Sequence, residues 1–540
     1  VDQGRYVKDL NREHKKNPGG IEVKQPRVTW KITGTGNNIM QTADSLRVAI
    51  AEQFSSSNIV WQSGKTESAE SILQVYIGPD LKSSQRYFWQ VKIWDNKGKG
   101  SKWSEVAFWE MGLLSQSDWK AKWIEMTGDT LRYAPSPHFR KEFSLGKNIA
   151  SARVYVTSHG YYELQLNGKK VGDQVLTPGW TSYGKRLQYQ VYDVTGMLLK
   201  GNNAIGAVLG DGWYRGTLGW GNNWANYGKR LGLLLQLKIT FTDGSESVIV
   251  SDETWKASND GAIRMNDIYN GETYDATKKL TGWNLPGYND KSWLVVRTGQ
   301  YNNSNLIASE GSPVRKIQEI KPVKIFRTPK GSLIVDMGQN MVGWLRLKVT
   351  GNKGTVVTLR HAEVMDKFGE FYTTNLRVAK CQLTYTLAGN GEETYEPRFT
   401  FMGFRFVEVT GFPGELTLDN LTGVVVHSDM AVTGSFECSN ALVNQLQHNI
   451  QWGQKGNFVD VPTDCPQRDE RLGWTGDAQA FCRTAAYNMD VSSFFTKWLK
   501  DISADQKPGG EVPDVIPDIL DKQGSTTTQT SAGWGTVAVI

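Results

Sequence analysis

The chain has 540 residues, of which 39% are hydrophobic and 21% are charged, and its formal net charge is +6. This length exceeds what one hydrophobic core can organise and predicts about three to five domains. No apolar run approaches the roughly 20 residues of a membrane-spanning helix, and the lysines and arginines are scattered along the chain. We therefore expect no membrane span and no nucleic-acid partner.

The cysteines give no sign of a metal or redox site. No CxxC pair occurs and no histidine has zinc-like spacing, so we predict no metal and no disulfide framework. No DxDxDG-type calcium loop is visible. The four cysteines are Cys381, Cys438, Cys465 and Cys482.

The first three regions have the pattern of β structure. Residues 1–112 contain short alternating runs, which predict a small sandwich: Arg27–Ile32, Ser71–Ile77, Arg86–Trp94 and Glu105–Met111. We expect Trp89 and Trp94 in its core. Residues 113–308 contain alternating strands around Asn167-Gly168, a strong hairpin signal, and predict a jelly roll. Residues 309–431 predict another sandwich.

Residues 432–540 change to a helical pattern. Leu442, Val443, Leu446 and Ile450 recur near the helical period, with Ser439 as the expected N-cap. Further helices are predicted at 478–488 and 491–506, the latter with an aromatic stripe that we interpret as core. The final segment, SAGWGTVAVI, is also helical in pattern. We expect an interrupted helical toroid in preference to a small complete bundle.

One stretch, TDCPQRDERLGWTGDA at 463–478, is dense in charge without periodicity. Pro466, Gly473 and Gly476 predict a loop, and loops on a rigid scaffold commonly carry function. Ordinary structural roles are the alternative. In that case Asp464 makes an Asx turn, Asp477 caps the next helix and Arg468 pairs with either acid.

The chemistry of this loop matches glycoside cleavage. Clustered carboxylates raise one another's pKa, as a general acid requires near neutral pH, and Trp474 offers a flat surface for a sugar ring. Phosphate binding by the arginines stays open, although the chain has no Gly-rich lysine loop.

The segment DCPQRDERLGWTGDAQAF resembles the signature of the bacterial α-L-rhamnosidases, glycoside hydrolase family 78. Other segments resemble the family in the same order: NPGGIEVKQPRVTW, LNGKKVGDQVLTPGWTSYGKRLQYQVYDVTGML, LGDGWYRG, GETYDATKKLTGW and DMGQNMVGW. The resemblance implies a fibronectin type III-like sandwich, a jelly roll and a further β-sandwich, followed by an all-α (α/α)6 barrel that is truncated. It also implies hydrolysis of terminal α-L-rhamnosides with inversion.

Carried onto this sequence, the resemblance makes Glu470 the general acid and places Asp464, Arg468, Trp474 and Asp477 at the rhamnose subsite. Neighbouring carboxylates are expected to keep Glu470 protonated, and Asp469 is a less secure choice of acid. The general base is expected beyond Ile540, so this polypeptide alone should lack activity. Glu511, Asp514 and Asp518 are expected to be loop or subsite acids. Thr536 stands where relatives usually have aspartate.

The expected partner is a rhamnose-containing oligosaccharide, polysaccharide or glycoside, with no cofactor. The start without Met and the extracellular nature of such glycans favour a periplasmic or secreted location. Two alternatives stay open: a carbohydrate-binding protein with an inactive barrel, and a glycosidase or lyase of related fold acting on another sugar. A lyase would require a tyrosine or histidine near an arginine, and the acidic loop has neither.

Overall fold

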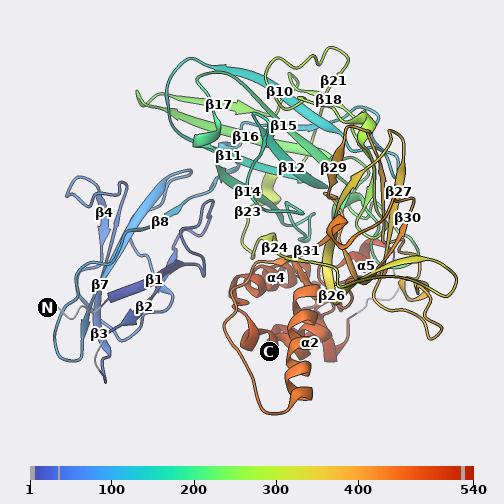
Figure 1. Cartoon of the computed structure of the whole chain (residues 1–540). Helices are drawn as coiled ribbons and strands as arrows, with labels where there is room; N and C mark the ends of the chain where they lie inside the picture. The colour runs from blue at the N-terminus through green and yellow to red at the C-terminus, as the bar shows by residue number, and fades with distance from the viewer. Residues whose placement is uncertain (1–5, 35–36, 525–529) are drawn as a thin grey trace. The chain divides into compact units, whose positions relative to one another are not determined.

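The computed structural model describes residues 6–34, 37–524 and 530–540 (Figure 1). The chain divides into two compact units. The first contains the residues up to Lys120 together with Ile307–Glu310, and the second contains Ala121–Leu306 and Gly311–Ile540.

The first unit is a β-sandwich, as predicted. One sheet has the order β1 (Tyr6–Arg12), β2 (Arg27–Thr33), β6 (Gln74–Val75). The other has the order β4 (Ile59–Gln62), β3 (Gln41–Ala49), β7 (Arg86–Asp95), β8 (Ala107–Glu110), with β5 (Thr66–Glu67) paired to β3. Trp30, Trp89 and Trp109 fill the core. Trp94 is only half-buried, with Lys65 and Lys92 over its ring, so its predicted core position is wrong.

The second unit begins with two facing sheets. Their strand orders are β13-β12-β15-β10-β18-β21 and β22-β9-β16-β11-β14, with β17 paired to β16. The bounds are β9 (Trp123–Glu125), β10 (His138–Leu145), β11 (Ile149–His159), β12 (Tyr161–Leu166), β13 (Lys169–Lys170), β14 (Leu187–Asp193), β15 (Gly201–Gly210), β16 (Gly232–Phe241), β17 (Glu246–Val250), β18 (Lys256–Ser258), β21 (Leu294–Val295) and β22 (Arg297–Gly299). Phe139, Leu235 and Trp255 belong to their shared core.

The hairpin predicted at Asn167-Gly168 is present between β12 and β13. Both turn residues have positive φ, 49° and 82°, as a two-residue type I′ turn requires. Glycine adopts such angles without a steric penalty, and asparagine tolerates them better than most residues. The prediction is confirmed because the turn is specified locally.

A large mixed sheet follows, with the order β19-β20-β28-β27-β30-β26-β31-β24, and with β25 and β29 paired to β26. Its strands are β19 (Ile263–Asp267), β20 (Gly271–Asp275), β24 (Val314–Ile320), β25 (Lys324–Arg327), β26 (Leu333–Thr350), β27 (Val356–Ala362), β28 (Gln382–Thr386), β29 (Glu392–Tyr395), β30 (Met402–Thr410) and β31 (Leu421–Ser428). β19 and β20 precede the predicted boundary at 308–309 and join this sheet through the parallel β20–β28 pair. Gly343 in β26 is required, because a Cβ there would lie 1.9 Å from the Val424 carbonyl oxygen.

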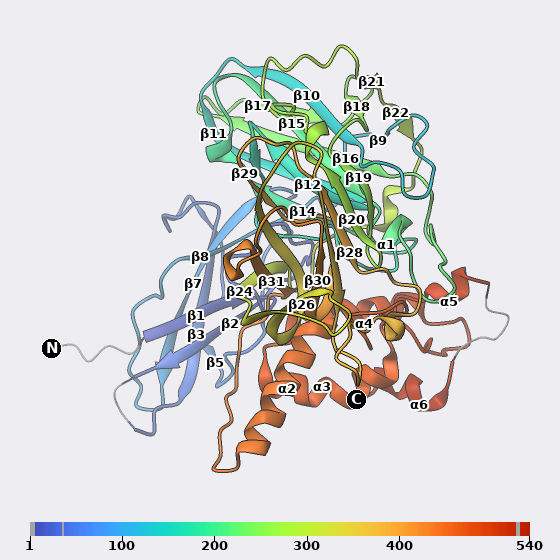
Figure 2. The ribbon, with the colours of Figure 1, turned by 45° about the vertical axis from the view of Figure 1, so that its right-hand side comes forward.

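Most helices follow the mixed sheet in the chain and are drawn in orange and red, and α2 packs against β26 and β31 (Figures 1 and 2). They are α2 (Ala441–Asn457), α3 (Thr475–Asn488), α4 (Ser492–Asp505), α5 (Ile519–Lys522) and α6 (Ala532–Gly535), with the short α1 (Gly212–Arg215) earlier in the chain. No helix in the described part of the chain is both long enough and apolar enough to cross a membrane.

The helix predictions are correct in type and differ in detail. Asn440, not Ser439, caps α2, and its side chain accepts from the Leu442 and Val443 amides. Leu442 and Leu446 are exposed, although their spacing suggested a packed face. On α4, Phe494, Trp498 and Ile502 are buried as expected.

Candidate active site

The acidic loop connects β33 (Val461–Pro462) to α3 and is anchored by one buried arginine. The Arg471 guanidinium donates to the carbonyl oxygens of Ile268 at 3.0 Å and Phe401 at 2.9 Å, and it lies over the rings of Tyr269 and Phe401. Arg471 is only 2% exposed. Its role is therefore structural, because it fixes the loop against the preceding β regions.

The backbone at Glu470 is strained and held from outside the loop. Its φ is +104°, an angle that costs a non-glycine residue on the order of 1–3 kcal/mol. The Glu470 amide donates to the Gly219 carbonyl at 3.0 Å, and the Tyr269 hydroxyl donates to the Glu470 carbonyl. These contacts impose the unusual angle and fix where the side chain points.

The side chain of Glu470 lies between two arginines. Its Oε2 accepts from Arg377 Nη2 at 2.8 Å and from Arg468 Nη2 at 3.0 Å, while Oε1 accepts from the Trp474 indole at 3.2 Å. The hydrogen bonds to the Glu470 carboxylate thus come from two guanidinium groups and one indole. That neighbouring carboxylates keep Glu470 protonated stays a prediction.

Asp464 has the environment that was predicted for Glu470. Burial raises the pKa of Asp464 to about 6, and the nearby Glu470 charge adds to the shift. Its Oδ1 accepts from the Leu472 amide at 3.1 Å, and Arg468 Nη2 lies 3.8 Å from Oδ2. Asp464 and Glu470 thus share Arg468.

Asp469 points away from this pair. Its Oδ1 accepts from Arg377 Nε at 2.6 Å and its side chain is buried. Arg377 therefore clamps both acids of the Asp469–Glu470 dipeptide. Which of the two neighbouring acids donates a proton stays a prediction, with Asp469 the less secure choice.

Trp474 and Asp477 stand at the start of α3. Trp474 is half-buried, occupies the N-cap position without a side-chain cap, and meets Trp220 edge-on at 6.1 Å. Asp477 lies in the first turn of α3, so its predicted N-cap role is wrong because the helix begins earlier, at Thr475. Partial burial of its carboxyl group raises the pKa of Asp477, and the Glu470 charge adds to this.

A cavity of about 360 Å³ opens between α2, the acidic loop and α3. Asp464 and Asp477 line it together with Asn457, Phe458 and Phe481. Arg468, Glu470 and Trp474 do not line it, although they contact one another and Arg468 reaches Asp464. The structure thus brings all five predicted residues into one neighbourhood and exposes two of them to the cavity.

Asp464, Cys465 and Glu470 bring potential metal-ligand atoms within 4.8 Å of one another. Burial raises the pKa of the Cys465 thiol to about 12, and arginines already occupy Glu470 Oε2. A cation would have to displace both guanidinium groups and bind a protonated thiol. These contacts disfavour metal binding at this position.

The remaining predicted acids have local contacts. Asp518 pairs with Lys507 at 2.7 Å, and Asp514 accepts from the Ser531 amide at 2.9 Å. Thr536 donates to Gln479 at 2.8 Å. The residues that sequence reasoning missed are Gly219, Tyr269 and Arg377, which lie far from the loop in the chain and match no local motif.

Four family models match the chain. They describe a Rha78A-like N-terminal immunoglobulin domain at residues 7–115, an alpha-L-rhamnosidase N-terminal domain at 147–318, a bacterial alpha-L-rhamnosidase concanavalin-like domain at 326–427, and a bacterial alpha-L-rhamnosidase 6 hairpin glycosidase domain at 431–540. An alpha-L-rhamnosidase of Streptomyces avermitilis is 35% identical over 98% of this chain and 67% of its own length. The chain belongs to the bacterial alpha-L-rhamnosidase family.

Another alpha-L-rhamnosidase, from Formosa agariphila, is 38% identical over 97% of this chain and 57% of its own length. The crystal structure of Streptomyces avermitilis alpha-L-rhamnosidase complexed with L-rhamnose has a TM-score of 0.93 and 33% identity, and it covers 99% of this chain and 68% of that one. The chain thus spans about 57–68% of these rhamnosidases. The immunoglobulin match also revises the fibronectin type III expectation for the first sandwich.

Proposed function

We propose that the whole protein is an inverting glycoside hydrolase that releases terminal α-L-rhamnose from rhamnose-containing glycans or glycosides. Family membership supports the reaction class. The observation in this chain that carries the proposal is the Asp464–Glu470 pair around Arg468, beside the Trp474 indole. It combines a carboxyl group of raised pKa with an aromatic surface suited to a sugar.

Glu470 is proposed as the proton donor, and Asp464 as the site where the proton rests before sugar binds. Oxygen atoms of the two carboxyl groups lie within 4.8 Å of each other, which is close enough for a proton to pass between them. Moving it from Asp464 to Glu470 would supply the general acid that protonates the glycosidic oxygen. Arg468, Trp474 and Asp477 would bind the sugar hydroxyls and ring.

Inversion also needs a general base, with the two carboxyl groups roughly 6.5–9.5 Å apart. None of the carboxylates described above is assigned this role. We propose that the base comes from the part of the relatives' length that this chain does not span, in an (α/α)6 barrel to which α2, α3 and α4 belong. The exposed Leu442 and Leu446 on α2 support further packing against this helix. We also propose a periplasmic or secreted location, where such glycans occur.

The test is hydrolysis of an unactivated rhamnosyl disaccharide by the full-length protein and its Glu470→Gln variant. Loss of general acid catalysis should reduce kcat by about 10²–10⁴-fold while rhamnose binding is retained. Glu408→Gln is the control, because Glu408 pairs with Arg360 at 2.8 Å outside the loop and its loss should leave kcat unchanged. Full activity of Glu470→Gln would reject the assignment.

The arginine contacts of Glu470 favour one alternative, a carbohydrate-binding protein that does not hydrolyse. A carboxylate held by Arg377 and Arg468 can accept hydrogen bonds from sugar hydroxyls without giving up a proton. In that case the full-length protein would bind rhamnose and hydrolyse neither the disaccharide nor p-nitrophenyl α-L-rhamnoside. The same assay therefore decides between the two functions.

A further inference from the structure

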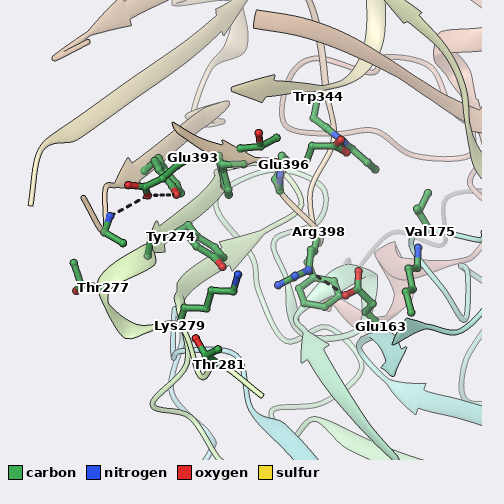
Figure 3. A pocket seen from close by; sticks show the side chains of 18 of the residues that line it. Glu163, Val175, Tyr274, Thr277, Lys279, Thr281, Trp344, Glu393, Glu396 and Arg398 are labelled. Carbon is green, nitrogen blue, oxygen red and sulfur yellow. Dashed lines mark hydrogen bonds and ion pairs between the residues drawn. The ribbon is translucent and has the colours of Figure 1, made fainter. Parts of the chain in front are cut away.

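A second cleft lies in the β part of the larger unit. A cavity of about 870 Å³ runs between the first pair of sheets and the mixed sheet (Figure 3). A neighbouring cavity of about 350 Å³ shares Glu163, Tyr274, Lys279, Thr281 and Arg398 with it. We call the two together the sandwich cleft. No residue of the acidic loop lines it, and its size exceeds that needed for one sugar ring.

The cleft presents aromatic rings that are only half-buried. Tyr274 is stacked on Tyr385 with ring centroids 5.7 Å apart and an interplanar angle of 18°, which fixes its orientation at the cavity wall. Trp283 lines the second cavity and is stacked on Trp293. Rings held in this way offer surfaces on which the C–H faces of sugars can pack.

Positive charge prevails where the two cavities meet. Arg398 binds Glu163 at 3.1 Å, and 36% of its side chain remains exposed in the cleft. The Lys279 ammonium has neither an ion pair nor a hydrogen bond among the residues that the structure describes. Lys170 is half-buried and donates to the Gln174 carbonyl oxygen at 2.9 Å. Of these three cations, only Arg398 forms an ion pair with Glu163, and Lys279 has no carboxylate partner among the described residues.

Three other carboxylates line the larger cavity, at Glu392, Glu393 and Glu396, and in the described part of the chain none of them is paired with Lys279 or Arg398. Glu396 is already paired with Lys316 and with Arg346, both at 2.6 Å. Glu393 accepts from the Tyr385 hydroxyl at 2.7 Å and from two backbone amides. Beneath Arg398, burial raises the pKa of Glu272 to about 7, so its negative charge is reduced at neutral pH.

We propose that the sandwich cleft binds an oligosaccharide that carries uronic acid residues, with a sugar carboxylate at Lys279 and Arg398 and a sugar ring against Tyr274. The guanidinium fork of Arg398 matches a planar carboxylate, and unpaired cations in a concave site attract anionic ligands. In Figure 3 the side chains of Tyr274, Lys279 and Arg398 all extend toward this cavity. This binding site goes beyond hydrolysis and does not depend on the acid at position 470.

The test is calorimetric titration of the full-length protein at low ionic strength with a galacturonic acid tetramer. Cellotetraose serves as the neutral probe and a carrageenan tetrasaccharide as the sulfated probe without carboxylates. Wild type should bind the galacturonate tetramer at least about tenfold more tightly than either comparison probe. Lys279→Gln should weaken that binding about tenfold, as loss of one charged hydrogen bond implies. Lys278→Gln is the matched control, because this neighbouring exposed lysine lines neither cavity.

Several results would overturn the proposal: no binding of the tetramer, equal binding of cellotetraose, tighter binding of the sulfated probe, or the same loss in both lysine variants. Hydrolysis of p-nitrophenyl α-L-rhamnoside should be unchanged in both lysine variants. Glu470→Gln should bind the tetramer like wild type. Failure of this proposal and failure of the proposed hydrolysis therefore give different results.

Discussion

Replacing Arg377 by Gln should shift the pH dependence of hydrolysis. Arg377 Nη2 lies 2.8 Å from Glu470 Oε2, and its Nε lies 2.6 Å from Asp469 Oδ1. The Arg377 side chain is 38% exposed, so solvent screens its charge and the interaction with the Asp464–Glu470 pair is worth about 0.7 kcal/mol. That energy corresponds to about half a pH unit.

The sign follows from the charge that is removed. Without the Arg377 guanidinium the protonated form of the Asp464–Glu470 pair becomes more favourable, so the pair keeps its proton to higher pH. The descending limb of the kcat profile of the full-length protein should move up by about half a pH unit. Arg377→Lys retains the charge and should move the limb less. Arg468, Asp469 and Asp477, which are charged groups near the pair, are unchanged in both variants.

Arg360→Gln is the control for this experiment. Arg360 pairs with Glu408 at 2.8 Å, and its side chain is 40% exposed, close to the value for Arg377. Arg360→Gln should leave the pH of the descending limb of the kcat profile unchanged. A limb that stays fixed or moves down in Arg377→Gln would refute the assignment of a shared proton to the Asp464–Glu470 pair.

Two further predictions concern buried charges. Lys497→Met leaves Asp460 and Asp501 without the ammonium that lies 3.3 Å from each, and should destabilise the protein by about 3 kcal/mol, measured as a lowered thermal midpoint. Lys122→Met is the control: it breaks the exposed Lys122–Glu253 pair and should lower the free energy of unfolding by at most about 1 kcal/mol. Equal destabilisation by Lys497→Met and Lys122→Met would contradict the prediction. The pKa of Glu272 is about 7 in the folded protein and 4.5 when unperturbed, so the wild type loses stability as the pH rises between these values. Glu272→Gln removes this loss. The free energy of unfolding of the variant minus that of the wild type should therefore be on the order of 3 kcal/mol more favourable at pH 8 than at pH 4. A difference in unfolding free energy between Glu272→Gln and wild type that does not change with pH would contradict this prediction.

Local signals predicted much of the fold. The Asn167-Gly168 turn was predictable because the two residues define the turn, and the helices were predictable from their apolar spacing. Helix starts were less certain, since a cap depends on which side chain reaches the first amides. Trp89 and Trp94 are five residues apart in β7, so strand alternation places them on opposite faces of the sheet, and only Trp89 belongs to the core.

The candidate site was only partly predictable. The five residues expected from the loop are in one neighbourhood because they are close in sequence and one buried arginine holds the loop in place. The charge around Glu470 was not predictable, because Arg377 lies 93 residues away in sequence and reaches the loop only through the folded β region. Contacts of this range leave no periodic or spacing signal in a single sequence.

The way Glu470 is held has a consequence for dissecting the protein. Its amide, its carbonyl and its carboxylate are each fixed by a different upstream segment, through Gly219, Tyr269 and Arg377. A fragment that kept every helix but began after β31 would lose all three supports, and residue 470 would relax from its strained conformation. The smallest piece able to hold residue 470 in this conformation therefore includes the β regions.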